Sequence, residues 1–427
     1  MPSSVSFYPS ELAAAIRDNW IAAAFDPALL PDQASLEQAA DVTYQASLLR
    51  EETEPVRCRT MLASPEDFRP YETVGRDGLA VMRFRRPAPF AAHELRKLSA
   101  AAGYYRSTLA VNRDAEGCLQ IWGMIFTGTR WLSQIHDADP HVSPLPPNLA
   151  IQVVAPGHLI VASGHRRLLE TSGGELLSEA FDPFRSEWLP LRFQPERASL
   201  LENAATAPLP SGIDGTRLCD SFVKDAAQNV IRRTLNLVRS RGHGGTLIYL
   251  SADAGRDAHA SELFRFRVAF ENDDATLRFR HLMRKLLQRV LEIGFEQNVP
   301  EVTWGIYRAM HDGQLAELDD ALVEFAHFLA DLMAADGALV LDRQFRIIGF
   351  GAEILGDLHV REIHRALDLE ASRTSLEPAD RAGTRHRSAY RLVSTAREAI
   401  ALVVSQDGGV RFVAHKDDKL TFWPYLP

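Results

Sequence analysis

Residues 336–350 read DGALVLDRQFRIIGF, and this stretch decides the fold of the C-terminal half of the chain. Its two apolar runs, at about 338–341 and 345–350, predict neighbouring buried strands joined by a polar turn. Apolar residues recur at helical spacing over 319–334, so a helix leads directly into the first strand. A helix that runs into buried strands predicts an α/β arrangement.

The segments around this stretch extend the same pattern. GTLIYL at 245–250 follows a glycine turn and predicts another buried strand, and strands are expected at 399–405 and 410–414. Amphipathic helices are predicted at about 221–239 and 275–294, and a further helix begins at Gly383 and runs to about Ala396. We therefore predict a mixed sheet flanked by helices in a domain of residues 217–427.

The N-terminal part mixes helices and hairpins. Helices are expected at about 10–24, 35–49 and 91–102, the second through a capping box of Ser35 and Gln38. Hairpins are expected at 107–126 and 149–163, around glycine-containing turns. This predicts an α+β domain of residues 1–202. Residues 203–216, NAATAPLPSGIDGT, are small, polar and rich in Pro and Gly, as linkers often are.

Composition limits the classes of function. A chain of 427 residues suggests two domains, and its net charge of −9 makes nucleic acid an unexpected partner. Its three cysteines show no CxxC spacing, which fits a reducing cytosol. No signal peptide and no apolar run long enough for a membrane span is recognised. We expect a cytoplasmic protein without a membrane partner.

The motif Gly383-Thr384-Arg385-His386-Arg387 is the first candidate for chemistry. A helix N-terminus attracts anions through its free N–H groups and dipole, and it normally disfavours cations. Three potential cations at this position therefore suggest a bound anion such as phosphate, with Thr384 as the expected N-cap. A solvated basic helix start is the alternative.

Two further motifs lie beside predicted strands. Asp336-Gly337-Ala338 places a carboxylate where a helix passes into a strand, suited to hold a metal ion or accept a hydroxyl proton. Ser405 and Asp407 follow the strand at 399–405, where open α/β sheets present ligand-binding groups, so Ser405 is a candidate for phosphate and Asp407 for metal. An ordinary Asp-Gly turn and an ordinary hairpin are the alternatives.

Taken in this order, GTLIYL, DGALVLD, GTRHRSAYRL and ALVVSQDGGVRFV resemble the diadenylate cyclase domain over about residues 217–420. The resemblance implies that two ATP-bound domains face each other in a homo-oligomer and condense two ATP into cyclic di-AMP and two pyrophosphates, with Mg²⁺ or Mn²⁺. It implies that Asp336 lies by the attacking hydroxyl and the metal. It further implies that Gly337, Ala338, Gly383, Thr384, Arg385, His386, Arg387 and Ser405 bind ATP.

Two features depart from that family's pattern. This chain reads VVSQD where the family commonly has VVSEE, so Gln406 replaces a potential metal ligand and Asp407 has to compensate. The segment 251–318 is also longer than a minimal cyclase domain needs. A catalytically degenerate domain that senses a nucleotide or cyclic dinucleotide is therefore the alternative, and a scaffold without nucleotide affinity is a third.

The N-terminal domain has a resemblance of its own. YQASLLREETEPVRCR at 44–59 and LAVNRDAEGCLQIWGMIFTG at 109–128 resemble the predicted sensor domain called DACNV, which precedes diadenylate cyclase domains in bacteria. This resemblance implies that an N-terminal sensory module regulates the C-terminal domain.

Overall fold

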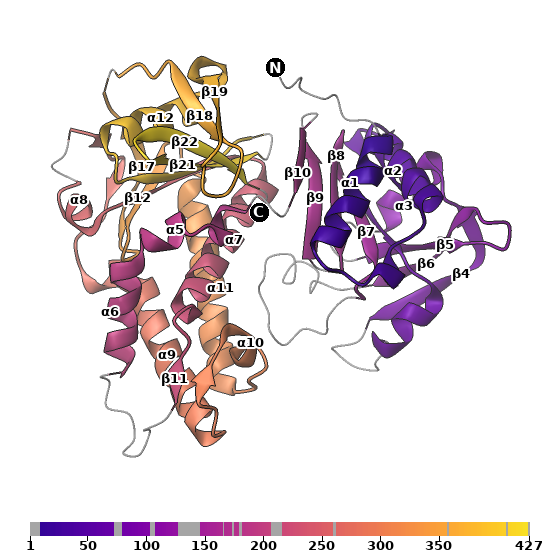
Figure 1. The fold of residues 1–427 in the computed structure, drawn as a ribbon, viewed down its shortest axis with the longest axis horizontal. Coiled ribbons are helices and arrows are strands. Elements are labelled where there is room, and N and C mark those ends of the chain that lie inside the picture. The colour runs from indigo at the N-terminus through magenta and orange to yellow at the C-terminus, as the bar shows by residue number, and fades with distance from the viewer. Residues whose placement is uncertain are drawn as a thin grey trace. The chain divides into compact units, whose positions relative to one another are not determined.

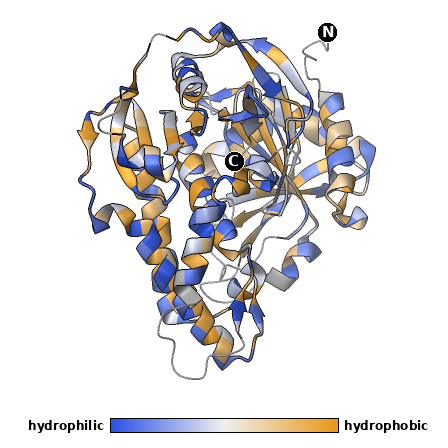
Figure 2. Cartoon of the chain, turned by 60° about the vertical axis from the view of Figure 1, so that its left-hand side comes forward, coloured by the Kyte–Doolittle hydropathy of each residue, from blue (hydrophilic) through white to orange (hydrophobic). Residues whose placement is uncertain are grey.

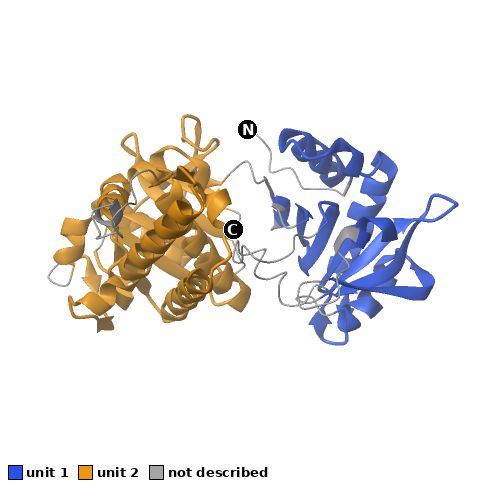
Figure 3. Cartoon of the chain, turned by 90° about the horizontal axis from the view of Figure 1, so that it is seen from below, with its two compact units in different colours: residues 1–135, 142–180 blue, residues 136–141, 181–427 orange. Residues whose placement is uncertain are grey.

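The structure is a computed structural model. It describes residues 9–71, 79–102, 107–126, 146–164, 166–172, 175–178, 182–205, 216–258, 262–356, 358–406 and 409–425. The chain divides into two compact units (Figure 3): the first comprises residues 1–135 and 142–180, and the second comprises 136–141 and 181–427. Each unit contains helices and a sheet, which confirms the α+β class.

The first unit is built on an eight-stranded sheet with the order β10-β9-β8-β7-β3-β5-β6-β4. The central strand β3 is buried throughout, parallel to β5 and antiparallel to β7. The strands are β3 (Cys58–Leu62), β4 (Ala80–Pro89), β5 (Ser107–Arg113), β6 (Leu119–Phe126), β7 (Leu149–Ala155), β8 (His158–Ser163), β9 (Arg166–Ser172) and β10 (Glu175–Ser178). A separate two-stranded ribbon pairs β1 (Arg50–Glu51) with β2 (Glu54–Pro55).

Three helices cover this sheet: α1 (Pro9–Ala22), α2 (Gln33–Ser47) and α3 (Ala92–Ala101). Their apolar faces form one core with the sheet, in which Trp20 and Leu36 are fully buried. A second cluster around Phe68 and Trp122 lies apart from that core. The two hairpins predicted from the sequence are confirmed as β5–β6 and β7–β8. The predicted capping box is wrong, because Asp32 caps α2 by accepting from the Ser35 N–H at 3.0 Å.

The second unit contains a ten-stranded mixed sheet in the order β13-β17-β16-β12-β20-β21-β22-β18-β19, with β14 also paired to β17 (Figure 1). The strands are β12 (Gly245–Leu250), β13 (Phe264–Arg265), β14 (Val268–Ala269), β16 (Ala338–Asp342), β17 (Ile347–Ile354), β18 (Glu362–Ala366), β19 (Thr374–Pro378), β20 (Ile400–Val404), β21 (Val410–Lys416) and β22 (Lys419–Tyr425). β11 (Arg217–Leu218) and β15 (Glu301–Val302) form a separate parallel pair. The mixed sheet predicted from the sequence is confirmed.

Helices cover both faces of this sheet. The longer ones are α6 (Gln194–Ala205), α7 (Phe222–Arg241), α9 (Arg278–Glu296) and α11 (Gly313–Met333), and they pack on one another on one face. Short helices α5 (Trp188–Leu191), α8 (Ala252–Arg256) and α10 (Trp304–Tyr307) accompany them. α12 (Thr384–Thr395) packs on the other face. Figure 2 shows hydrophobic residues along the strands and along one side of the long helices, as burial between helix and sheet requires.

The boundary between the units differs from the predicted one. The sequence predicts that residues up to 202 belong to the N-terminal domain, but α5 and α6 pack with the second unit. Trp188 stacks on Trp423 with ring centroids 4.4 Å apart, and Asp182 pairs with Arg232 at 2.6 Å. These buried contacts fix the segment to the C-terminal sheet. Of the predicted linker 203–216, residues 206–215 lie outside the described residues.

Candidate functional site

The strand register brings two of the three sequence motifs to one edge of the second sheet. β12 lies between β16 and β20, with Thr246 opposite Ala338 and Gly245 opposite Val404. β16 starts at this edge, so Asp336 and Gly337 lie just before it, and β20 ends there, so Ser405 lies just beyond it. Because neighbouring strands are about 4.8 Å apart, the two motifs lie roughly 10 Å from each other.

Glycines pack the backbone closely at the Asp336 motif. Gly337 has φ +105° and Gly351, on β17, has φ +62°. A Cβ added to Gly337 would lie 2.5 Å from the Gly351 carbonyl carbon, closer than real atoms approach. Both positions therefore require glycine. Asp336 and Gly337 are exposed, whereas Ala338 is buried against the α12 face of the sheet.

The Ser405 motif is held by a second close approach. A Cβ on Gly244, which has φ +65°, would lie 2.7 Å from the Val404 carbonyl oxygen and 3.2 Å from the Gln406 nitrogen. Ser405 is half-buried, and its Oγ donates to the Gly409 carbonyl at 3.0 Å. Gln406 is exposed. The glycine turn before β12 thus fixes the backbone that carries Ser405 and Gln406.

The third motif reaches the same region through α12. Only residues 396–399 separate α12 from β20, and α12 packs on β20 and β21, so the helix runs back along the sheet. Its 12 residues span about 18 Å and the five residues of β20 about 17 Å. The start of α12, which carries residues 383–387, therefore lies toward the sheet edge of Asp336 and Ser405. The strand register thus places two of the motifs at one edge, and the direction of α12 carries the third toward that edge.

The side chains of GTRHR do not all face the same way. Thr384 and Arg387 line a hollow of about 230 Å³ with Asp380 and Arg391. Arg385 is two residues from Arg387, about 200° around the helix, and does not line this hollow. His386 is 7% exposed, so it is the most enclosed of the five. The motif therefore presents Arg385 and Arg387 on different sides of the helix.

The prediction that Thr384 caps α12 is wrong. Gly383 occupies the N-cap, with φ −61° and ψ 166°, and no side chain caps the helix. Thr384 is the first helical residue and is exposed. Because no side-chain oxygen accepts from the first N–H groups, these donors face outward and are available to an anion.

A tyrosine anchors α12 to the sheet below the motif. Tyr390 is fully buried, stacks on Phe422 with centroids 6.5 Å apart, and accepts from Arg411 Nη1 at 2.8 Å. Burial raises the pKa of the Tyr390 hydroxyl. Since this hydroxyl stays protonated, its role in the described structure is to hold the helix in place.

The predicted metal ligands were Asp336 and Asp407. Asp407 lies outside the described residues, and among the residues that the structure describes no group of three or more His, Cys, Asp or Glu side chains could hold a metal ion. Asp336 and the Gln406 amide are the oxygen donors of the two motifs. Mg²⁺ often takes only one or two carboxylates and completes its coordination with substrate phosphates and water. The residues present fit an ion shared with a bound triphosphate rather than an all-protein cage.

Arg267 is a candidate functional residue beside the Asp336 motif that the sequence did not reveal. Its backbone N–H donates to the Gly351 carbonyl at 3.3 Å. A Cβ added to Gly351 would lie 2.9 Å from the Arg267 Cβ and also close to the Asp336 carbonyl oxygen, so the Arg267 side chain lies beside the Asp336 motif. The side chain is exposed. Arg267 lies in the long segment 251–318, and the alternation Phe264, Arg265, Phe266, Arg267 was the available signal.

Comparison with known families identifies part of the first unit. The family described as "Probable sensor domain DACNV" matches residues 25–126, which include α2, β1 to β6 and α3. The chain therefore carries a probable sensor domain, and the same sheet continues beyond the match through β7 to β10. No curated protein and no solved structure matches the chain. No helix among the described residues has the length and apolar character needed to cross a membrane.

Proposed function

We propose that the second unit is a diadenylate cyclase domain that condenses two ATP into cyclic di-AMP and two pyrophosphates, under the control of the N-terminal sensor domain. The observation that supports this proposal is that DGA and Ser405 lie at one edge of the sheet and that the start of α12, which carries GTRHR, runs toward that edge. Phosphoryl transfer depends mainly on positioning and on neutralising charge, and this edge offers both.

Each group has a specific part in the reaction. Asp336 is exposed and no described residue pairs with its carboxylate, so it is available to a metal ion or to a ribose hydroxyl. Gly337 and Gly351 let the two backbone segments pack closely, which fixes the backbone that carries Asp336. The uncapped start of α12, together with Arg385 and Arg387, binds the negatively charged phosphate groups. A bound Mg²⁺ or Mn²⁺ would supply further neutralisation of the phosphates.

Two copies of the chain are needed, since each ATP supplies the 3′-hydroxyl that attacks the α-phosphate of the other. Two bonds form and two pyrophosphates leave, so the reaction balances without a further reactant. The opposed directions of Arg385 and Arg387 fit such an arrangement, because one helix start can then contact phosphates on two sides. We therefore propose a homo-oligomer with facing cyclase domains.

The test is product formation by the full-length protein. Incubation with ATP and Mn²⁺ or Mg²⁺ should yield cyclic di-AMP, identified by mass spectrometry. Arg385→Ala combined with Arg387→Ala should remove the product, while Arg217→Ala, at an exposed arginine far from the motifs in sequence, should not. An unchanged yield in the double variant would contradict the assignment of the phosphate site.

A second function is a nucleotide sensor without turnover, and Gln406 is the observation that favours it. This exposed amide stands where the resemblance expects a carboxylate ligand, and an amide is a weaker partner for a hard cation. Binding of a non-hydrolysable ATP analogue in calorimetry, with no product from ATP, would favour the sensor. Product that appears only with Gln406→Glu would identify this position as the cause.

A further inference from the structure

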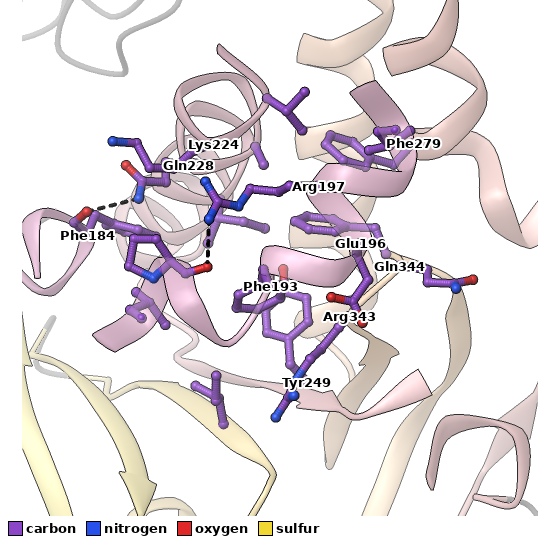
Figure 4. A pocket seen from close by; sticks show the side chains of 18 of the residues that line it. Phe184, Phe193, Glu196, Arg197, Lys224, Gln228, Tyr249, Phe279, Arg343 and Gln344 are labelled. Atoms are coloured by element: carbon purple, nitrogen blue, oxygen red, sulfur yellow. Dashed lines mark hydrogen bonds between the residues drawn. The ribbon is translucent and has the colours of Figure 1, made fainter. Parts of the chain in front are cut away.

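A cavity of about 70 Å³ lies within the second unit, between the helices α6, α7 and α9 and the sheet (Figure 4). Four aromatic rings surround its centre. Phe193 meets Tyr249 edge-on at 5.3 Å, Phe345 lies 5.4 Å from Tyr249, and Phe279 stacks on Phe345 at 4.2 Å. Of the 17 other lining residues, ten are apolar and seven are polar or charged. Since an apolar cavity of about 150 Å³ holds one benzene molecule, this smaller cavity admits a molecule of only a few heavy atoms.

The cavity contains a hydroxyl without a partner. Tyr249, on β12, is 2% exposed, and its hydroxyl makes no hydrogen bond to any described residue. A buried polar group normally finds a partner, because leaving it unpaired is costly. Burial raises the pKa of this hydroxyl, so it remains protonated and can donate.

Cationic side chains stand around the same cavity. Arg197, Arg280 and Arg343 line it, and each has one buried nitrogen without a hydrogen-bond partner: Nε, Nη1 and Nε, respectively. Glu196 also lines it with one buried unpaired oxygen, and Lys224 lies 3.5 Å from Asp225. Cations outnumber carboxylates in the lining, so the unpaired donors favour an anionic group.

We propose that this cavity binds a short-chain aliphatic carboxylate. The aliphatic chain inserts among Phe193, Tyr249 and Phe345, and the carboxylate accepts from the Tyr249 hydroxyl and from the unpaired guanidinium N–H groups. This site is separate from the motif edge: Leu247 and Tyr249 belong to the core of the long helices, whereas Ala338 belongs to the core under α12. The proposal therefore stands independently of cyclase activity.

Calorimetric titration of the full-length protein with propionate tests the proposal, with the uncharged propionamide as the matched ligand. We expect propionate to bind and to raise Tm, and the amide to bind at least about tenfold more weakly, since hydrogen bonds to charged groups are the stronger ones. Equal binding of the two would overturn the anionic part of the proposal, and no binding of either at millimolar concentration would overturn the site.

Two variants locate the binding. Tyr249→Phe should weaken propionate binding about three- to tenfold, the effect of one hydrogen bond. Ala227→Met, which fills the cavity from α7, should abolish it. Tyr307→Phe is the control, since that buried hydroxyl is bound by Asp319 and does not line the cavity. Tyr249→Phe removes only an unpaired hydroxyl, so we expect this variant to fold even if Ala227→Met does not. Unchanged affinity in Tyr249→Phe would overturn the site.

Discussion

An aspartate lies at each end of β16, and one of the two is exposed whereas the other is buried. Asp336 precedes the strand, is exposed, and has no described partner for its carboxylate. Asp342 ends the strand, is 2% exposed, and its Oδ1 accepts from the N–H groups of Gln344 and Arg346 at 2.8 and 3.0 Å. The comparison shows that the environment of a carboxylate, rather than its residue type, decides whether it is available for chemistry.

The difference extends to what each site needs from its side chain. At Asp342 an oxygen acceptor closes the turn from β16 to β17, and burial raises the pKa despite the two N–H donors, so the negative charge is a cost. Asp336 accepts no hydrogen bond from a described residue, and the proposed function assigns a role to its charge. Replacement of aspartate by asparagine, which removes charge and keeps an oxygen, therefore separates the two roles.

The largest effect is expected for Asp336→Asn. Under the proposed function, loss of this charge should reduce cyclic di-AMP formation by about a thousandfold or more, in the range found when a group stabilising the transition state is removed. The free energy of unfolding should change by less than about 0.5 kcal/mol because the residue is exposed. Product measurement and urea unfolding provide the two readouts.

The control is Asp331→Asn, five residues earlier on α11, where an exposed carboxylate pairs with Arg241 at 2.6 Å. This variant should retain full product formation. If Asp336→Asn were as active as the control, the two ends of β16 would not differ in function, and the comparison would fail.

Gly337→Ala is expected to have the next largest effect. The residue has φ +105°, and the new Cβ would collide with the backbone of Gly351. Strain and displacement of two paired strands should cost about 2–4 kcal/mol of unfolding free energy. Urea unfolding measures the loss. Gly117→Ala, at φ +84° in an open turn of the first unit, is the control that carries the φ strain without the collision and should lose about 1 kcal/mol.

Asp342→Ala should destabilise the protein by about 1–3 kcal/mol, since it leaves two N–H groups without their acceptor. Asp342→Asn should lie within about 0.5 kcal/mol of the natural protein, because its Oδ1 accepts both bonds and its side chain carries no charge to bury. The difference between these two variants in urea unfolding is the measurement. Equal losses in both would mean that the charge itself stabilises this end of the strand.

Much of the second unit could be predicted from sequence because its strands are continuous apolar runs. β12, β16 and β20 are buried on both faces, so they read as strands without ambiguity. β18 and β19 were missed because few of their residues are buried, and β22 was missed because its apolar run is short and contains Pro424. The meeting of DGA and Ser405 depends on β12 lying between β16 and β20, which local pattern cannot specify.

The domain boundary was harder to predict for a different reason. Residues 203–216 have the composition of a linker, whereas the second compact unit already begins at residue 181. The contacts of Trp188 explain why the boundary lies earlier in the chain, because its ring stacks on Trp423, a residue more than 200 positions away. The cavity around Tyr249 could not be predicted either, since its lining comes from segments spread over residues 184–412.

A third aspartate sharpens the comparison, because it is held by charge instead of by burial. Asp312 caps α11 by accepting from the Leu315 N–H at 3.0 Å, and Arg289 donates to both of its oxygens, at 3.1 and 2.6 Å. The hydrogen bonds from Arg289 lower the pKa of Asp312 from 3.8 to about 2. The pKa shift of Asp312 is therefore opposite in sign to that of Asp342, whose pKa is raised.

Asp312→Asn keeps the helix cap but removes the charge and one of the two hydrogen bonds from Arg289, so at pH 7 it should cost about 1–2 kcal/mol of unfolding free energy. A carboxylate whose pKa is lowered on folding stabilises the protein above its unfolded pKa, and this contribution is lost as the pH falls toward its folded pKa. The gap between the natural protein and Asp312→Asn should therefore be constant from pH 7 to about 5 and close between about pH 4 and 2. Urea unfolding across this range measures it. A gap that stayed constant down to pH 2.5 would show that Arg289 holds Asp312 by geometry rather than by charge.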